Sequence, residues 1–379
     1  MIFTIRDIEL LCLLRWCRYL PPDELADCFD EMTIANLKGL RLILAHKASG
    51  ALTMTSEGDT FLEAYIKSLP ENVRQSYLAA NTLRRIRRAS VMLTAYRAGL
   101  RVFTTDIMSL KERSAFYLPT LMRGHGTNPW SNSRIAALLR LGDMLFAAHY
   151  VCPGIGEMLL VDELNAFHNN TAQIKNVARA FFFAGASYGD ILAELDVEPA
   201  TELKRYVSYA DAYRQLSLPV HLLSCDATGA MQLRLMALPD YRQTLTRAAL
   251  QARYAPAPKD VPAWDALFEG KPFVMAADMD LRRIDDAIHA ARERGMNQIV
   301  MAALKPQVEA VLKKRYRDTG LARVYSIKED ALRELGVSTL YTPPMEGYRT
   351  DKGEVIHAPL IQAARKTGRP SGKQSRTLV

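Results

Sequence analysis

Paired cysteines, long apolar segments and glycine-rich phosphate loops are all missing from this sequence. Its five cysteines among 379 residues include no Cys-x-x-Cys pair, which excludes a zinc ribbon and a small disulfide scaffold. Scattered cysteines of this kind are typical of core thiols in a reducing cytoplasm. The most apolar stretch, residues 135–161, is interrupted by charged residues, histidine and proline, so we expect no membrane span.

The first 20 residues offer no signal peptide either, because charged side chains are scattered through them: Arg6, Asp7, Glu9, Arg15 and Arg18. A secretory signal needs an uninterrupted apolar core, so we predict a cytoplasmic protein. Hydrophobic residues make up 49% of the chain and charged residues 24%, which is ordinary for a globular protein. A length of 379 residues favours two or three domains.

Several catalytic signatures are also missing. There is no His-x-His metal pair, and no Glu-x-Lys follows Asp226 where a restriction-type nuclease would need one. The sequence His289-Ala290-Ala291-Arg292, with Tyr325 downstream, matches the His-x-x-Arg of tyrosine recombinases, but strands and helices alternate around it and their catalytic core is all-helical. We therefore assign no catalytic residue, no metal ligand and no cofactor.

Positive charge is abundant and unevenly distributed. The chain has 49 Lys and Arg against 41 Asp and Glu, a net charge of +8. Residues 72–101 carry +7 and residues 361–379 carry +5, neither with any acid, whereas residues 1–71 are net −4. Such clusters attract polyanions, so we predict that the arginine run of the first cluster contacts DNA phosphate or a partner: Arg84, Arg85, Arg87 and Arg88.

Residues 3–69 are predicted to form a small domain of helices with one hairpin. The expected order is a helix over 4–18, a short helix over 23–29, a helix over 34–47 with Thr33 as its N-cap, a strand over 51–54 and a helix from 55. In the third helix Leu37, Leu40 and Leu44 would form the buried stripe. Lys38 and Arg41 should then lie on its exposed face.

This order resembles a winged-helix DNA-binding domain. The segment Leu52-Thr53-Met54-Thr55-Ser56-Glu57-Gly58 looks like the end of a wing, where a strand closes and a helix begins. The resemblance implies that the helix over 34–47 lies in the major groove, with contacts from Lys38, Arg41 and Lys47.

The rest of the chain predicts a mixed α/β fold. A basic linking helix over 72–101 leads into an α/β region over 102–254, then a βαβαβ unit over 255–340 and a basic, flexible tail over 341–379. Within the α/β region we expect a hairpin around Gly142-Asp143 and strands over 179–184, 220–224 and 231–237, with a turn at Asp226-Ala227-Thr228-Gly229. Ala255-Pro256-Ala257-Pro258 is the best candidate for a linker.

Asp278 and Asp280 follow an apolar strand and precede a helix. Two carboxylates at the carboxyl end of a strand could hold Mg²⁺, as in the Asp-x-Asp of the topoisomerase-primase fold. That fold also needs an upstream Glu, and none has suitable spacing here. We therefore expect Asp280 to cap the helix that begins at Leu281.

The whole layout loosely resembles the replication-relaxation family of plasmids and conjugative elements. Besides the winged-helix segment, the likeness lies in Ser133-Arg134-Ile135, in Phe181-Phe182-Phe183-Ala184-Gly185 and in the segment from Pro219 to Asp226. The resemblance implies DNA binding in a mobile-element context, and it supplies no catalytic residue.

From the sequence we expect a non-enzymatic DNA-binding protein of a plasmid, phage or conjugative element, regulatory or accessory to replication or transfer. One alternative is a metal-dependent nucleic-acid enzyme, toprim-like or a degenerate nuclease, that uses Asp278 and Asp280. A second is a protein-assembly module in which the winged helix binds protein, including a second copy of this chain. The net charge of −4 over residues 1–71 favours that second alternative.

Overall fold

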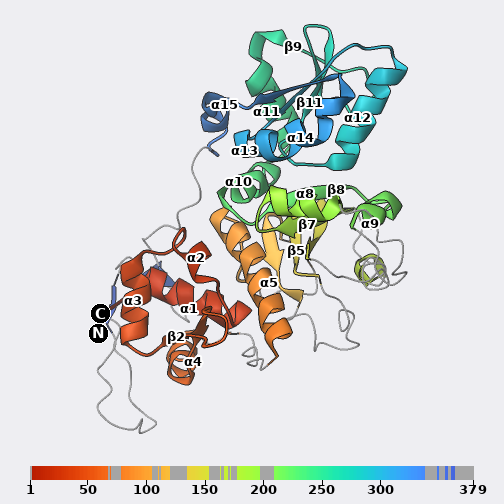
Figure 1. Cartoon of the computed structure of the whole chain (residues 1–379). Helices are drawn as coiled ribbons and strands as arrows, with labels where there is room; N and C mark the ends of the chain where they lie inside the picture. The colour runs from red at the N-terminus through yellow and green to blue at the C-terminus, as the bar shows by residue number, and fades with distance from the viewer. Residues whose placement is uncertain are drawn as a thin grey trace, which may run out of the picture. The chain divides into compact units, whose positions relative to one another are not determined.

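The computed structural model describes residues 2–66, 78–104, 112–119, 135–152, 177–196 and 209–337, a few residues between these ranges, and short strands at 348–349, 355–356 and 360–362. The chain divides into two compact units, residues 1–93 with 342–379 and residues 94–341. Helix α5 (Ala79–Arg97) crosses the boundary between them. Both units contain helices and strands, so the predicted mixed α/β class is confirmed (Figure 1).

The first unit is built around helix α1 (Ile5–Cys17), which confirms the helix predicted over 4–18. It begins at a capping box: the Asp7 amide donates to the Thr4 hydroxyl at 3.2 Å, and the Thr4 amide donates to the Asp7 carboxylate at 2.6 Å. Apolar residues surround this helix instead of forming one stripe, and nearly all of them are buried. A helix of that composition must be covered on every side, so α1 forms the centre of the unit.

Short elements follow α1 in the first unit: α2 (Pro22–Leu25), α3 (Glu31–Gly39), β2 (Ile43–Ala45), β3 (Leu52–Met54) and α4 (Ser56–Glu63). Strands β2 and β3 form an antiparallel hairpin, and Leu20 forms a bridge with Leu52 on the other side of β3. The predicted start of α4 is confirmed, because the Thr55 hydroxyl accepts a hydrogen bond from the Gly58 amide at 3.0 Å.

The third helix was predicted with wrong bounds. Asp30 caps it in place of Thr33, accepting a hydrogen bond from the Thr33 amide at 2.6 Å. The helix ends at Gly39, and Arg41 takes a φ of 57°, a left-handed conformation that breaks helical continuity. Residues 43–45 then alternate as a strand, with Ile43 buried and Leu44 45% exposed.

Part of the segment predicted as a flexible tail is folded. Strand β16 (Leu360–Gln362) pairs antiparallel with β1 (Ile2–Thr4), and β14 (Tyr348–Arg349) pairs with β15 (Val355–Ile356). The prediction of flexibility over the whole of 341–379 is therefore wrong for these strands. The basic residues of the tail, from Arg365 onwards, lie outside the described residues.

The second unit contains two five-stranded sheets. In the first, neighbouring strands follow the order β4 (Ala115–Tyr117), β5 (Ala137–Leu141), β6 (Met144–Tyr150), β7 (Ala178–Gly185) and β8 (Val220–Ser224). Strand β5 pairs antiparallel with both β4 and β6, whereas β7 pairs parallel with both β6 and β8. The predicted hairpin around Gly142 and the predicted strands over 179–184 and 220–224 are confirmed.

The second sheet has the order β13 (Ala322–Ser326), β12 (Ile299–Ala303), β11 (Lys271–Met275), β10 (Ala266–Phe268) and β9 (Tyr254–Ala255). Helix α12 (Leu281–Glu293) joins β11 to β12, and both parallel pairings of the predicted βαβαβ unit are present. The predicted linker at 255–258 begins with the last residue of β9 and lies inside the second unit, so it does not connect the two units.

The two sheets share one apolar core. A single cluster of buried residues includes Phe181 and Leu222 from the first sheet and Val274 and Met301 from the second. Helices α8 (Tyr188–Leu195) and α10 (Ala227–Met236) lie between the sheets (Figure 1). The Leu222 amide also donates to the Met279 carbonyl at 3.1 Å, which joins the edge of β8 to the turn after β11.

The strand predicted over 231–237 is wrong, because these residues belong to helix α10. Asp226, predicted to lie in a turn, caps this helix and accepts hydrogen bonds from the Thr228 and Gly229 amides at 2.8 and 2.9 Å. The helix is buried on most sides, so its apolar residues show no clear stripe. A restriction-type nuclease core needs a second strand after Asp226, and the structure has helix α10 at that position.

We expect Gly229→Ala to destabilise the second unit by about 3 kcal/mol or more, because a Cβ at this position would overlap backbone atoms. That Cβ would lie 1.7 Å from the Ser224 carbonyl oxygen and 2.9 Å from its carbon. Urea denaturation followed by circular dichroism measures the change. Gly189→Ala is the control, since its nearest contact would be an ordinary 3.5 Å. Equal stability of the two variants would contradict this close packing.

Candidate functional site

The predicted DNA contacts Lys38, Arg41 and Lys47 are all exposed, but they do not share one helix. Lys38 is exposed in the last turn of α3. Arg41 is exposed in the turn that follows, and Lys47 is exposed in the turn between β2 and β3. The structure therefore agrees with the prediction for Lys38 and places Arg41 and Lys47 on neighbouring turns.

Side-chain contacts fix the turns that carry these cations. The Thr55 hydroxyl donates to the Arg41 carbonyl at 2.7 Å, which holds the left-handed turn after α3. His46 packs edge-on against Tyr19 with 5.1 Å between ring centroids, and its Nδ1 lies 2.9 Å from the Ser49 hydroxyl. His46 thus stabilises the hairpin turn beside Lys47 and is only half-exposed.

Acidic side chains are exposed on the same part of the chain, over α2 and the start of α3: Asp23, Asp27, Asp30 and Glu31. Met32 is 77% exposed beside them. The surface around α3 therefore combines an acidic and apolar N-terminal part with cations from Lys38 onwards.

The arginine run of α5 is less exposed than predicted. Arg84, Arg85 and Arg87 are half-buried, and Arg88 is only 4% exposed. On the same helix Leu83 is 47% exposed, whereas Met92 and Leu93 are buried. Arg88 lies near Cys17, whose pKa is raised to about 12 by burial despite that positive charge. Arg88 is therefore part of the interior and is removed from the predicted phosphate contacts.

Arg84 and Arg85 belong to a cluster of like charges. The pKa of the Arg85 guanidinium is lowered mainly by burial, and repulsion from Arg18 and Arg84 adds to the effect, while Tyr19 acts against it. Arg85 therefore lies half-buried in a positively charged part of the first unit.

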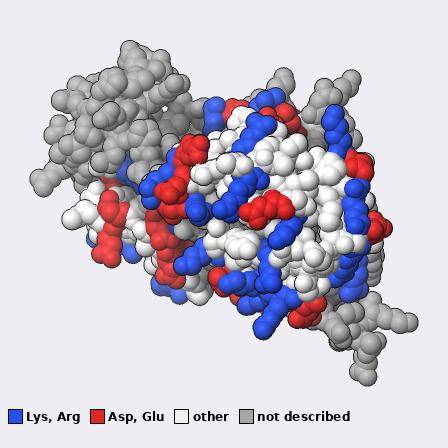
Figure 2. Space-filling view, turned by 90° about the horizontal axis from the view of Figure 1, so that it is seen from above, with Lys and Arg blue, Asp and Glu red and all other residues white. Residues whose placement is uncertain are grey.

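The face of the molecule drawn in Figure 2 is mixed in sign. Figure 2 shows Lys and Arg side chains interspersed with Asp and Glu over the described surface in view. No broad basic patch is present on that face, so any phosphate contact there would depend on individual side chains.

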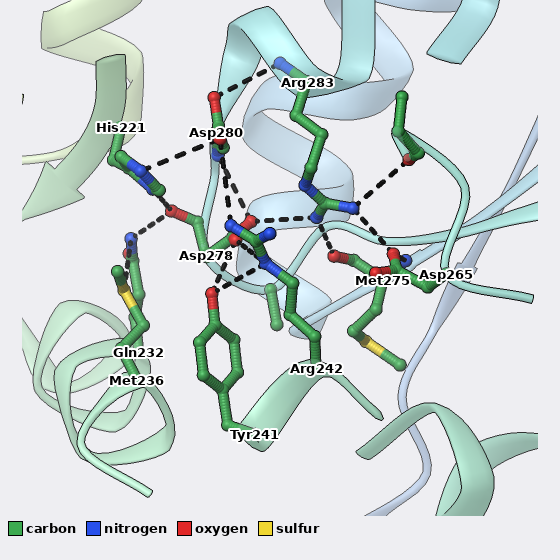
Figure 3. A network of polar contacts seen from close by, with 12 residues as sticks. His221, Gln232, Met236, Tyr241, Arg242, Asp265, Met275, Asp278, Asp280 and Arg283 are labelled. Carbon is green, nitrogen blue, oxygen red and sulfur yellow. Dashed lines mark hydrogen bonds and ion pairs between the residues drawn. The ribbon is translucent and has the colours of Figure 1, made fainter. Parts of the chain in front are cut away.

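Asp278, one of the two carboxylates weighed as Mg²⁺ ligands, lies at the centre of a buried polar network (Figure 3). Its Oδ2 accepts from the Tyr241 hydroxyl at 2.6 Å and from Arg242 Nε at 2.7 Å. Its Oδ1 lies 3.3 Å from an Nη of Arg283, which also binds Asp265 at 2.7 Å. Both carboxylate oxygens of Asp278 are therefore occupied by protein donors.

The electrostatics of Asp278 follow from these partners. Burial alone would raise its pKa, but the Arg242 and Arg283 guanidiniums outweigh burial, with smaller contributions from His221 and Tyr241. The net effect holds the pKa of this carboxyl well below its usual range. Asp278 is thus a permanent anion balanced by two cations, which is the arrangement of a structural ion-pair network.

Asp280 caps α12 as predicted, accepting a hydrogen bond from the Arg283 amide at 3.2 Å. Its Oδ2 lies 3.8 Å from both His221 Nε2 and an Nη of Arg242. Among the residues that the structure describes, no group of three His, Cys, Asp or Glu side chains is placed to hold a metal ion.

The network joins segments that are distant in the sequence. Gln232 of α10 donates to the carbonyls of Leu222 and Asp278, both at 2.8 Å, and His221 Nδ1 lies 2.9 Å from the same Asp278 carbonyl. Sequence reasoning missed Tyr241, Arg242 and Gln232, because no local pattern marks them as partners of residue 278. Gln232 and His221 thereby connect β8 of the first sheet to the turn after β11 of the second.

The free thiols agree with the sequence interpretation. Cys12, Cys17, Cys28 and Cys225 are buried, Cys152 is partly buried, and none forms a disulfide. Within the described part of the chain, no helix combines the length and the apolar character needed to cross a membrane.

Comparison with family models, curated proteins and solved structures finds no match to this chain.

Proposed function

We propose that residues 2–66 form a winged-helix domain that binds duplex DNA, and that the protein is a non-enzymatic DNA-binding factor of a mobile genetic element. The observation that carries the proposal is the order of elements: α1, the Leu20 bridge, α2, α3 and the β2–β3 hairpin, with exposed cations on α3, after it and at the hairpin turn. In such a domain a short helix reads the major groove while flanking cations bind phosphates.

The proposal includes a regulatory or accessory role in replication or transfer, in the cytoplasm. The five free cysteines support that compartment. The acid-free charge of +7 over residues 72–101 supports a polyanionic partner, because clustered positive charge attracts phosphate.

Salt titration of the full-length protein on duplex DNA tests the electrostatic part of this proposal. We expect Arg84→Gln, Arg85→Gln and Arg87→Gln together to flatten the log–log salt dependence of the affinity by about 2–3, since each lost phosphate contact removes about 0.9. The affinity for every DNA sequence should fall alike, because phosphates carry no sequence information. Fluorescence anisotropy measures both effects.

Arg317→Gln, Arg323→Gln and Arg333→Gln make the matched control, since these arginines are exposed on the second unit. A control variant with the same loss of slope would show that total charge, and not the α5 cluster, determines binding. Absence of any DNA binding at low salt by the wild-type protein would reject the proposed function itself.

The exposed acids and Met32 favour one second candidate, a protein-binding role for the α2–α3 surface, including self-association. A dimer that Met32→Asp abolishes, found by sedimentation in a protein without DNA affinity, would favour that role. The enzymatic alternative at Asp278 has less support, because both carboxylate oxygens are bound by protein donors. Mg²⁺-dependent nicking that is lost in Asp278→Asn would restore it.

A further inference from the structure

A cavity of about 780 Å³ lies in the second unit where α8, α12 and α14 (Lys313–Tyr316) meet. Its volume falls within the usual range of small-molecule sites, roughly 300–1,000 Å³. Apolar side chains line part of it and cations line another part: Leu192, Ala193, Ile288, Arg292, Lys314 and Arg315. None of these residues takes part in the Asp278 network or in the proposed DNA surface.

The backbone that presents two of these cations is unusual. The π-helical turn η2 (Val308–Leu312) lies between α13 (Lys305–Gln307) and α14. One extra residue in a helical turn rotates everything after it by about 100° relative to a regular α-helix. Such π-turns are rare in proteins, and those that occur are often found at functional sites. Here the turn sets the direction in which Lys314 and Arg315 project.

Arg315 is held in place at the edge of the cavity. Its guanidinium lies over the rings of Tyr213 and Tyr316, with 5.6 and 5.8 Å to their centroids. Asp285 lies 3.5 Å from the same guanidinium and accepts hydrogen bonds from the hydroxyls of Tyr213 and Tyr316, both at 2.8 Å. The charge of Asp285 is therefore already balanced, and Arg315 is fixed before any ligand arrives.

Arg292 and Lys314 add positive charge without a partner. Both are exposed side chains of the cavity lining, and among the described residues neither has a carboxylate partner. The neighbouring Lys313, in contrast, pairs with Glu309 at 2.6 Å and does not line the cavity. The cavity thus combines unpaired cations with an apolar wall, Leu192 and Ile288, and one further acid, Asp196.

We propose that this cavity binds a nucleotide, with its phosphates against Arg292, Lys314 and Arg315 and its base against Leu192 and Ile288. Guanidinium and ammonium groups form the strong, charge-assisted hydrogen bonds that phosphate oxygens accept. The Asp196 carboxylate is an acceptor for ribose hydroxyls or base amino groups. A DNA backbone would contact the cations but would leave the apolar wall uncovered, so a small ligand fits the lining better.

Isothermal titration calorimetry on the full-length protein tests the proposal, with ADP, GDP, CDP, UDP and inorganic pyrophosphate as probes. At least one nucleoside diphosphate should bind with a dissociation constant below about 1 mM, and pyrophosphate should bind at least about tenfold more weakly because it has no base. Lys314→Gln should weaken nucleotide binding by about tenfold, and Lys313→Gln should leave it unchanged. Ala193→Trp should abolish binding by filling the cavity.

The opposite results overturn the proposal. The proposal is wrong if no nucleoside diphosphate binds, or if pyrophosphate binds as tightly as the nucleotides. It is also wrong if Lys314→Gln and Lys313→Gln lose nucleotide affinity equally. A loss of DNA affinity in Lys314→Gln without nucleotide binding would assign these cations to DNA instead. The outcome is independent of the proposed function, because DNA binding through the first unit needs none of these residues. If Ala193→Trp fails to fold, the two exposed lysines still decide the question.

Discussion

Asp278→Asn is expected to destabilise the second unit by about 3–5 kcal/mol, the usual cost of removing one partner from a buried ion-pair network. The variant keeps the size of the side chain but removes the charge that balances Arg242 and Arg283. Arg283 is buried, with only 8% of its surface exposed, so its charge would lose a buried counter-ion. Urea denaturation of the full-length protein, followed by circular dichroism, measures the difference.

The same residue predicts the acid sensitivity of the fold. Because the folded-state pKa of Asp278 is depressed, its contribution is fully present above the unfolded pKa of about 3.9 and is lost as the pH falls below that value. The wild-type protein should therefore lose stability below about pH 4 more steeply than Asp278→Asn. Parallel acid profiles for the two proteins would show that the network carries no such contribution.

Asp330→Asn is the matched control for both measurements. Its side chain is 85% exposed and pairs with Arg333 at 3.4 Å, so we expect a change within about 0.5 kcal/mol. If Asp278→Asn were as stable as this control, the network would not hold the sheets together, and the enzymatic alternative for Asp278 would gain weight.

The second large effect is expected from Lys38→Ala, Arg41→Ala and Lys47→Ala combined. These side chains are exposed and take part in no core packing, so the first unit should remain folded. Each base or phosphate contact of a cation contributes about 1–3 kcal/mol to recognition, so affinity for a specific duplex should fall by roughly a hundredfold or more. Fluorescence anisotropy with a labelled duplex measures the loss.

A control with the same change in total charge separates local contacts from long-range attraction. Lys305→Ala, Lys313→Ala and Lys328→Ala also remove three exposed cations, all on the second unit. We expect this control to bind specific DNA nearly as the wild-type protein does. Equal losses in both variants would mean that α3 and the hairpin turn are not the recognition surface.

The sequence predicted much of the fold because many elements carry strong local signals. Helix α12 has a clear amphipathic pattern and a capping Asp280, so its type and start were predictable. Strands β11 and β12 contain short, buried apolar runs on either side of this helix, which indicates parallel pairing. In these regions local and tertiary preferences agree.

Other elements could not be predicted because local patterns were ambiguous. Met231, Leu233 and Leu235 alternate as a strand would, yet they belong to the buried helix α10. Residues 34–47 contain apolar residues at helical spacing, yet the left-handed turn at Arg41 divides them into a helix and a strand. Tertiary packing decides such cases, and one sequence does not contain that information.

Predictions of exposure at these sites were also right where local sequence decides exposure and wrong where distant residues decide it. Exposure of Lys38, Arg41 and Lys47 follows from their local context, and the structure agrees with it. Arg88 is buried near Cys17, and Asp278 binds Arg242, and in both cases the partner lies far away in the sequence. Long-range charge pairs leave no spacing signal, so a metal-ligand pattern and a structural ion pair look alike in sequence.

The measurement that tests the central claim most directly is the affinity of the wild-type protein for DNA. A labelled duplex from the region upstream of the protein's own coding sequence is compared with a shuffled duplex of equal length, at fixed physiological salt. A winged helix that reads bases should bind its target at least about 10³-fold more tightly than the shuffled duplex. Equal affinity for the two duplexes, or no affinity for either, would contradict sequence-preferring DNA binding by this protein.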